Sequence, residues 1–351
     1  MKHIFVVHSP ITYLSALGVV LLEEIEKKDV LIISESFRLD YEPIPIVQVS
    51  SMKSFSLLKK RSFKIYNEID TIIDKFSSDD KFIAYIPVFH LLDRYLITHP
   101  LCLKFNFIEE GFASYYKYYR GIQHAYIAGY KWRYSKGIKG IKERYINIIN
   151  IIKGISPSIL ALPTFYTAYA SDPNIIFYGF HEKSHYLGVN RKILSFNSII
   201  DHYKLKTKYN LNNTTIWIGD PDVISLIGNT TELYDSLKKS FINYLQNNNI
   251  SSIYIRFHYR EINEQKKQFI DFFNQNNIMV IEIEQDTILE VELIKAKNVT
   301  LVGIFSSLLV YGGIMGHTSL SIYNYLPLSF KKVSNASNDQ LDIFWNFVDK
   351  L

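Results

Sequence analysis

The sequence predicts an α/β protein with two parallel sheets, and three observations lead to this fold class. Short apolar runs alternate with helical patterns along the chain, as in stacked βα units. One polar stretch, 203–213, interrupts the alternation and ends in turn-forming asparagines. A length of 351 residues suits two domains with separate cores. We therefore expect a first domain over 1–202, a linker over 203–213 and a second domain over 214–351, facing each other across a cleft.

The expected strands are short apolar runs, and helical patterns follow most of them. The strand candidates are Ile4–Val7, Val30–Ile33, Phe82–Ile86, Lys104–Ile108, Asn174–Phe177, Thr215–Ile218, Ser252–Phe257, Ile278–Ile283 and Val299–Gly303. The helix candidates include Ile11–Glu26, Glu232–Asn247, Glu264–Asn274, Asp286–Lys295 and a last helix over Asp339–Leu351. In open α/β sheets ligands bind at the carboxyl ends of strands. The chemistry is therefore expected in the loops that follow the strands.

Composition favours a folded cytoplasmic protein. Hydrophobic residues make up 48% and charged residues 21% of the chain. The single cysteine, Cys102, excludes an intramolecular disulfide and a cysteine-based zinc cluster, and fits a reducing compartment. The apolar start is broken by polar residues and lacks a small-residue cleavage site, and no stretch reaches the roughly 20 apolar residues that span a bilayer.

A basic segment stands out in the first half of the chain. Between Tyr115 and Lys153 there are nine lysines and arginines and one acid, Glu143, interleaved with aromatic residues. Such a segment suits a polyanion, an anionic inner-membrane surface that it would contact peripherally, or an acidic glycan. A solvated basic face is the simpler interpretation, and no nucleic-acid motif accompanies the segment, so nucleic acid is not an expected partner.

An acidic pair follows the fourth expected strand. Glu109 and Glu110 are adjacent carboxylates, whose repulsion can raise one pKa and suit that group to general-base work. Gly111 would let the backbone turn tightly after them. The same three residues are also common in surface turns.

Two further loops carry residues suited to a phosphate. His258 follows Ser252–Phe257 between Arg256 and Arg260; a histidine can neutralise a departing phosphate and arginines bind its oxygens, although an edge-strand histidine is the alternative. Ser306 and Ser307 open a helix after Val299–Gly303 and present donors to an anion, although Ser306 can be a simple N-cap.

Taken in order, these motifs resemble those of the bacterial GT-B sialyltransferases, which include lipooligosaccharide sialyltransferases and capsular polysialyltransferases. The acidic pair with glycine, His258-Tyr259 and Ser306-Ser307 are similar to that family's acidic, His-Pro and Ser-Ser motifs. The opening Val7-His8-Ser9-Pro10-Ile11 and the stretch Ile218-Gly219-Asp220-Pro221 resemble two more family segments. Tyr259 stands where the family has proline, which removes a constraint on that loop and leaves the donor sugar open.

The resemblance implies an inverting, metal-independent transfer of a CMP-activated acidic sugar to a glycan of the capsule or lipooligosaccharide, with no cofactor. In that family pattern Glu110 is the favoured base, Glu109 is its partner and His258 assists the departing CMP. The donor side comprises Gly219, Asp220, Arg256, Arg260, Ser306 and Ser307. The acceptor side comprises His8, Ser9 and Gly111. The sugar can be sialic acid, pseudaminic acid or Kdo, and the acceptor can itself be anionic.

Other interpretations come from different classes. Asp220-Pro221-Asp222 matches a metal-binding Asp-x-Asp, although its place after a strand favours a turn. His181-Glu182-Lys183-Ser184-His185 matches the zinc-hydrolase pattern His-Glu-x-x-His, which requires a well-formed helix and a third ligand. The residues before it favour a strand and a break instead. A non-catalytic polyanion-binding protein using 115–153 is the third alternative.

Overall fold

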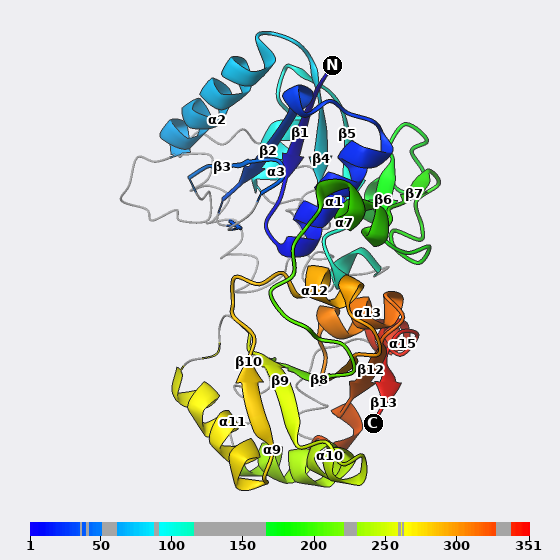
Figure 1. The fold of residues 1–351 in the computed structure, drawn as a ribbon. Coiled ribbons are helices and arrows are strands. Elements are labelled where there is room, and N and C mark those ends of the chain that lie inside the picture. Colours follow the sequence, from blue (N-terminus) through cyan, green and yellow to red (C-terminus); the bar gives the residue numbers. More distant parts are fainter. Residues whose placement is uncertain are drawn as a thin grey trace, which may run out of the picture. The chain divides into compact units, whose positions relative to one another are not determined.

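The computed structural model divides the chain into two compact units, Met1–Lys204 and Leu205–Leu351 (Figure 1). The residues it describes are 1–35, 37–39, 42–50, 62–87, 91–115, 166–220, 230–258, 261, 263–327 and 338–351. Each unit contains one parallel β-sheet. The boundary between the units lies inside the stretch 203–213 that the sequence marks as a linker.

The first unit contains a seven-stranded sheet in the order β3-β2-β1-β4-β5-β6-β7, with every neighbouring pair parallel. Its strands are β1 (Lys2–Val6), β2 (Val30–Ser34), β3 (Ile46–Gln48), β4 (Phe82–Ile86), β5 (Cys102–Ile108), β6 (Phe177–Gly179) and β7 (Arg191–Ile193). The chain adds strands on one side of β1 and then, from β4 onward, on the other. This is the Rossmann order with a seventh strand, and it predicts a ligand site at the carboxyl ends of β1 and β4.

The helical elements of the first unit connect these strands. They are α1 (Pro10–Leu22), η1 (Lys27–Asp29), α2 (Ser62–Ser77), α3 (Leu91–Ile97), η2 (Phe112–Tyr115), η3 (Tyr166–Tyr169) and α7 (Phe196–Tyr203). Helix α1 begins at Pro10 because Ser9 caps it: the Thr12 N–H donates to Ser9 Oγ and the Ser9 N–H donates to Thr12 Oγ1. A Cβ on Gly18 would lie 2.9 Å from Ile199 Cδ1, so glycine lets α7 pack closely on α1.

The second unit has the same strand order, β10-β9-β8-β11-β12-β13, again parallel throughout. Its strands are β8 (Thr215–Ile218), β9 (Ser252–Arg256), β10 (Met279–Glu282), β11 (Thr300–Gly303), β12 (Thr318–Ser321) and β13 (Asp349–Lys350). Its helical elements are α9 (Thr230–Leu237), a π-helical turn (Lys238–Ile242), α10 (Asn243–Asn247), α11 (Asn263–Gln275), α12 (Leu289–Lys295), α13 (Ser307–Ile314), η5 (Tyr323–Tyr325) and α15 (Asn338–Phe344). The direction of strand addition reverses between β8 and β11.

Aromatic packing fills the core of the second unit. Trp217 on the fully buried strand β8 stacks on Phe241, with ring centroids 5.3 Å apart. Phe269 and Phe273 of α11 meet edge to face at 5.1 Å in the same cluster. Side chains from α11 and from the helical stretch after β8 thus close over the same region of the second sheet.

Residues after Lys204 are fastened to the second unit. The Glu292 carboxylate of α12 accepts the backbone N–H groups of Lys208, at 2.7 Å, and Tyr209, at 3.1 Å. Leu205 and Leu211 are buried. From Leu205 onward the stretch expected as a linker therefore packs as part of the second unit.

The C-terminal residues differ from expectation. The last helix predicted over Asp339–Leu351 is wrong in its second half, because α15 ends at Phe344 and Asp349–Lys350 forms strand β13 beside β12. Phe344 and Val348 are buried, and the Leu351 N–H donates to the Ser321 carbonyl at 3.0 Å. Strand β13 pairs the backbone hydrogen-bonding groups on the open edge of β12, and Val348 is buried beside it. These interactions stabilise a strand more than the helical sequence pattern stabilises a helix.

Each strand predicted from the sequence overlaps an observed strand, so the alternation of elements is confirmed. Within the part of the chain that the structure describes, no helix is both long and apolar enough to cross a membrane.

Candidate functional site

The acidic pair after β5 contains two carboxylates in different surroundings. Glu109 is fully buried; its Oε1 accepts the Tyr115 hydroxyl at 3.0 Å and its Oε2 accepts the Phe180 N–H at 2.7 Å. Burial, and then the charge of Glu109, raises the pKa of Tyr115, so this hydroxyl stays protonated and donates. Glu109 thus joins β5 to η2 and to the end of β6, a structural task for a carboxylate with both oxygens engaged.

Replacing Glu109 with glutamine should lower the free energy of unfolding by about 1–3 kcal/mol, because the new amide NH₂ would face an N–H or O–H donor. Urea denaturation monitored by circular dichroism measures this loss, and Tyr115→Phe, which removes one donor only, should lose less. An E109Q protein of unchanged stability that has lost turnover would instead make Glu109 the catalytic base.

Glu110 lies where it can meet a substrate. Its side chain is 20% exposed, and its Oε1 is 3.6 Å from Nε2 of His8, which follows β1. The Glu110 N–H donates to Ser114 Oγ at 2.9 Å, which fixes the backbone beside the carboxylate. Gly111 has a φ of +133°, a conformation that L side chains rarely adopt, so the tight turn expected there is present. The structure therefore brings His8, Glu110 and Gly111 together at the carboxyl edge of the first sheet.

Ser9 has a structural task beside them. Its hydroxyl caps α1 through Thr12, and the His8 N–H donates to Thr12 Oγ1 at 2.9 Å. The capping box therefore sets the path of the loop that carries His8, and Ser9 contributes to the candidate site through this loop.

In the second unit, the loops after β8 and β9 meet. The Gly219 N–H donates to the Arg256 carbonyl at 2.8 Å, and a Cβ on Gly219 would lie 3.0 Å from the His258 nitrogen. A side chain at position 219 would crowd the His258 backbone and the Glu261 carboxylate, so glycine suits this close approach. Gly219, Asp220 and His258 are thereby gathered at the carboxyl ends of β8 and β9, next to the point where strand order reverses.

Sequence reasoning missed Glu261 in this group. Its Oε2 accepts the His258 N–H at 2.7 Å, and its own N–H donates to the His258 carbonyl at 2.9 Å. The same oxygen would lie 2.7 Å from a Cβ on Gly219. The signal was the three-residue spacing from His258 to Glu261, which lets a carboxylate fold back onto the backbone of its own turn.

The serine pair opens α13 as expected. Ser306 is the N-cap, with its Oγ accepting the Leu308 N–H at 3.3 Å, and Ser307 is exposed at the first helical position. Helix α13 follows β11, the strand beside β8. The serines therefore lie on the other side of the strand reversal from His258, at a helix N-terminus, where the helix dipole favours an anion.

Of the two arginines beside His258, the structure describes Arg256 only. The Arg256 guanidinium donates to the backbone carbonyls of Glu284 and Gln285. Burial lowers its pKa. These bonds commit part of its donor capacity to holding β9 against the loop after β10. Arg260, Tyr259 and Pro221-Asp222 lie outside the described residues.

The His-Glu-x-x-His stretch does not form the helix that zinc-hydrolase chemistry requires. Residues 182–187 form turns, and His185 has a φ of +47°. His185 is buried beside the rings of Tyr166 and Phe177, and burial lowers its pKa to about 3. A neutral histidine inside an aromatic cluster is a core residue. The zinc-hydrolase interpretation therefore lacks its structural basis.

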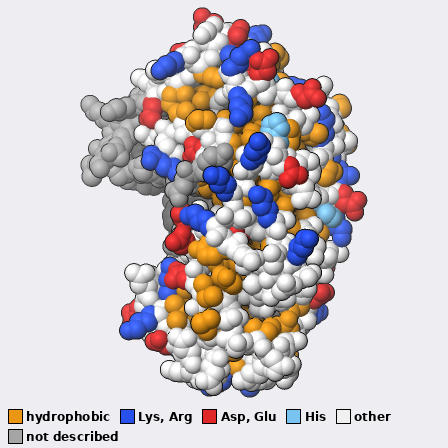
Figure 2. Space-filling model, in the orientation of Figure 1, with side chains coloured by type: hydrophobic (Ala, Val, Ile, Leu, Met, Phe, Trp, Pro, Cys, Tyr) orange, Lys and Arg blue, Asp and Glu red, His pale blue; other side chains and the backbone are white. Residues whose placement is uncertain are grey.

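The basic segment expected over 115–153 lies outside the described residues except for Tyr115. On the face of the molecule in Figure 2, Lys and Arg side chains have Asp and Glu side chains among them. This face therefore carries charges of both signs.

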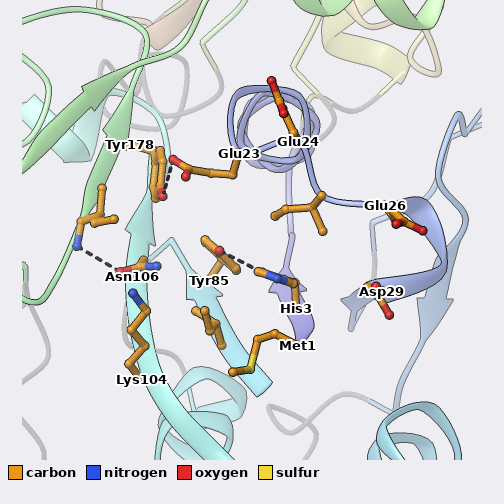
Figure 3. Close-up of a pocket in the computed structure, with 13 residues that line it drawn as sticks. Met1, His3, Glu23, Glu24, Glu26, Asp29, Tyr85, Lys104, Asn106 and Tyr178 are labelled. Atoms are coloured by element: carbon orange, nitrogen blue, oxygen red, sulfur yellow. Dashed lines mark hydrogen bonds between the residues drawn. The ribbon is translucent and has the colours of Figure 1, made fainter. Parts of the chain in front are cut away.

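A hollow of about 370 Å³ lies on the face of the first sheet (Figure 3). Its floor is polar: the Tyr178 hydroxyl donates to Glu23, and Tyr85 meets His3 at 3.0 Å. Glu23 also pairs with Lys192. These side chains satisfy one another, and the lining contains no residue of the expected site. The hollow lies beyond the last turn of α1, away from the strand ends that carry Glu110, so we place the candidate site at the strand ends.

No protein-family model matches the chain, and no curated protein sequence matches it. A solved sialyltransferase from Photobacterium damsela matches with a TM-score of 0.50 and 12% sequence identity, over 100% of this chain and 81% of that one. A 2,6-sialyltransferase from a Photobacterium species, solved with CMP and lactose, matches with a TM-score of 0.45 and 13% identity, over 88% and 69% of the two chains. Anabaena HepE, solved with UDP and glucose, matches with a TM-score of 0.43 and 10% identity, over 99% and 96%. The first likeness spans the whole chain and confirms the predicted GT-B fold of two Rossmann-like α/β domains.

Proposed function

We propose that this chain is an inverting glycosyltransferase that moves an acidic sugar from a CMP donor to a hydroxyl of a glycan acceptor. The observation that carries the proposal is that both Rossmann-ordered sheets bear chemically suited residues at the carboxyl ends of their strands, within a fold shared over the whole chain with a sialyltransferase. The first unit takes the acceptor and the second takes the nucleotide.

Glu110 is the general base of the proposed reaction. Its carboxylate accepts the proton of the acceptor hydroxyl while the hydroxyl oxygen forms a bond to the anomeric carbon of the donor sugar. The bond from that carbon to the CMP phosphate oxygen breaks, and its electron pair leaves with CMP. The accessible Glu110 suits this role, whereas the Glu109 carboxylate is occupied by Tyr115 and Phe180. His8, 3.6 Å from Glu110, helps to orient the carboxylate.

The second unit stabilises the departing CMP. His258 supplies a proton or positive charge to the phosphate, and the first turn of α13 with Ser306 and Ser307 supplies hydrogen-bond donors. Gly219 and Asp220 complete the nucleotide side. CMP leaves as a phosphate monoester and develops less charge than a departing diphosphate. Fixed protein donors are therefore sufficient, and the proposed reaction needs neither a metal ion nor a cofactor.

This proposal predicts that cytidine nucleotides bind more tightly than UDP or GDP and that EDTA leaves turnover intact. Isothermal titration calorimetry measures the first, and release of CMP from CMP-sialic acid with mixed glycan acceptors measures the second. Loss of turnover on chelation, with recovery in Mn²⁺ or Mg²⁺, would contradict the metal-free step. Preference for UDP would contradict the donor class.

The same assay separates the candidate donors. CMP-sialic acid, CMP-pseudaminic acid and CMP-Kdo share the nucleotide and an anomeric carboxylate, so the proposed step is the same for all three. Turnover with one of them on capsular or lipooligosaccharide acceptors identifies both substrates. We further propose a cytoplasmic protein whose segment 115–153 meets an anionic membrane surface or an acidic acceptor. Cosedimentation with anionic vesicles and acceptor kinetics of lysine-to-glutamine variants distinguish these two roles.

A further inference from the structure

The carboxylate of Glu261 lies between the loops that follow β8 and β9. One of its oxygens accepts the His258 N–H at 2.7 Å, and its N–H returns a bond of 2.9 Å to the His258 carbonyl. The carboxylate also occupies the space that a Cβ on Gly219 would need. A carboxylate in this place fixes the backbone of the histidine loop and lies close to Gly219 of the neighbouring loop.

The groups around Glu261 come from four elements and differ in sign. Asp220 follows β8, Glu282 lies on β10, Lys266 lies on α11, and the His258 N–H belongs to the turn after β9. Burial raises the pKa of Glu261 to about 7, with Asp220 and Glu282 adding to the rise and the His258 N–H and Lys266 opposing it. Lys266 is divided between partners, since its Nζ is 3.4 Å from Glu282 Oε1. The neutral and charged forms of Glu261 are therefore both accessible near neutral pH.

We infer that Glu261 is a positioning residue that couples nucleotide binding to proton uptake: its carboxyl group holds the His258 loop, and a phosphate bound at that loop favours the protonated form. The inference rests on the proposed nucleotide site. It goes beyond that site by assigning a proton-linked role to a residue outside the resemblance motifs.

The physical reason is electrostatic. A phosphate at the His258 loop adds negative charge near Glu261 and disfavours its ionised form, as Asp220 already does. Below about pH 7 the carboxyl of the free protein is already neutral, so binding requires no proton. Above that pH, binding must first protonate Glu261, so affinity falls as pH rises until the pKa of the complex is reached.

The test compares CMP affinity of wild type and E261Q by calorimetry from about pH 5.5 to about pH 9. Glutamine keeps an oxygen for the His258 N–H and cannot ionise. The titration of the CMP phosphate is common to both proteins and cancels in the ratio of the wild-type Kd to the E261Q Kd. The wild-type Kd divided by the E261Q Kd should be constant below about pH 6 and should rise by about tenfold or more by about pH 9. A rise of one unit in the pKa of Glu261 on CMP binding corresponds to a tenfold change in affinity.

Two further variants separate coupling from structure. E261A removes the acceptor and should weaken CMP binding at every pH, with E261Q restoring affinity. E264Q changes an exposed carboxylate on α11 and should leave the wild-type pH profile unchanged. A flat ratio for E261Q, or equal affinities for E261A and E261Q at every pH, overturns the inference.

An infrared titration of the Glu261 carboxyl group, without and with nucleotide, distinguishes this inference from the proposed function. The infrared band of the protonated Glu261 carboxyl group, present in wild type and absent in E261Q, should disappear as pH rises, with a midpoint near pH 7. Added nucleotide should move that midpoint upward. If UDP moves it and CMP does not, the donor class is wrong and the coupling holds. If neither CMP, UDP nor GDP moves it, the coupling is wrong.

Discussion

Replacing Glu110 with glutamine should lower kcat by about 10²- to 10⁴-fold, the contribution of a general base. Glutamine keeps the shape of the side chain and its place beside His8, and it cannot accept a proton. CMP affinity should barely change, because Glu110 belongs to the first unit and the nucleotide is assigned to the second. Steady-state CMP release and calorimetry with CMP measure the two quantities.

Glu182→Gln is the matched control for this change, because it alters an exposed carboxylate of the same unit. It should keep normal turnover and stability. If E110Q turns over at the wild-type rate, the assignment of the acidic pair fails and the glycosyltransferase proposal loses its catalytic base. If E110Q loses CMP affinity to the same extent as turnover, Glu110 acts on the donor instead.

Replacing His258 with alanine should damage binding and chemistry together. A hydrogen bond to a charged group contributes about 1.5–3 kcal/mol, so the Kd of CMP should rise by about 10- to 100-fold. Loss of assistance to the departing phosphate should lower kcat by about 10²-fold. Calorimetry and single-turnover kinetics measure the two losses separately.

The phosphate dependence makes this prediction specific. Cytidine has no phosphate, so its affinity should be equal in wild type and H258A. H258Q restores a neutral donor without a titratable proton and should recover part of the CMP affinity while turnover stays low. Equal losses of cytidine and CMP affinity would place His258 at the nucleoside and contradict its role on the phosphate.

Much of the fold could be predicted because local patterns encode it. Runs such as Phe82–Ile86 and Thr215–Ile218 are buried strands, and apolar residues at helical spacing follow them. The same patterns located the strand-end loops and hence Glu110, His258 and Ser306. Strands with weak signals escaped prediction: β3, β7, β12 and β13 are two to four residues long and each is at least partly exposed, so neither apolar content nor alternation marks them.

The sequence by itself determined two α/β domains and the loops that carry candidate chemistry, because apolar periodicity and the residues after each strand are local properties. Tertiary structure alone decided the strand order, since parallel apolar strands offer nearly interchangeable partners and only the packed sheet selects β1 beside β4 and β8 beside β11. It also separated Glu109 from Glu110. Successive residues at a strand end point to opposite sides, and only the packing of η2 and β6 shows that the Glu109 side is the core.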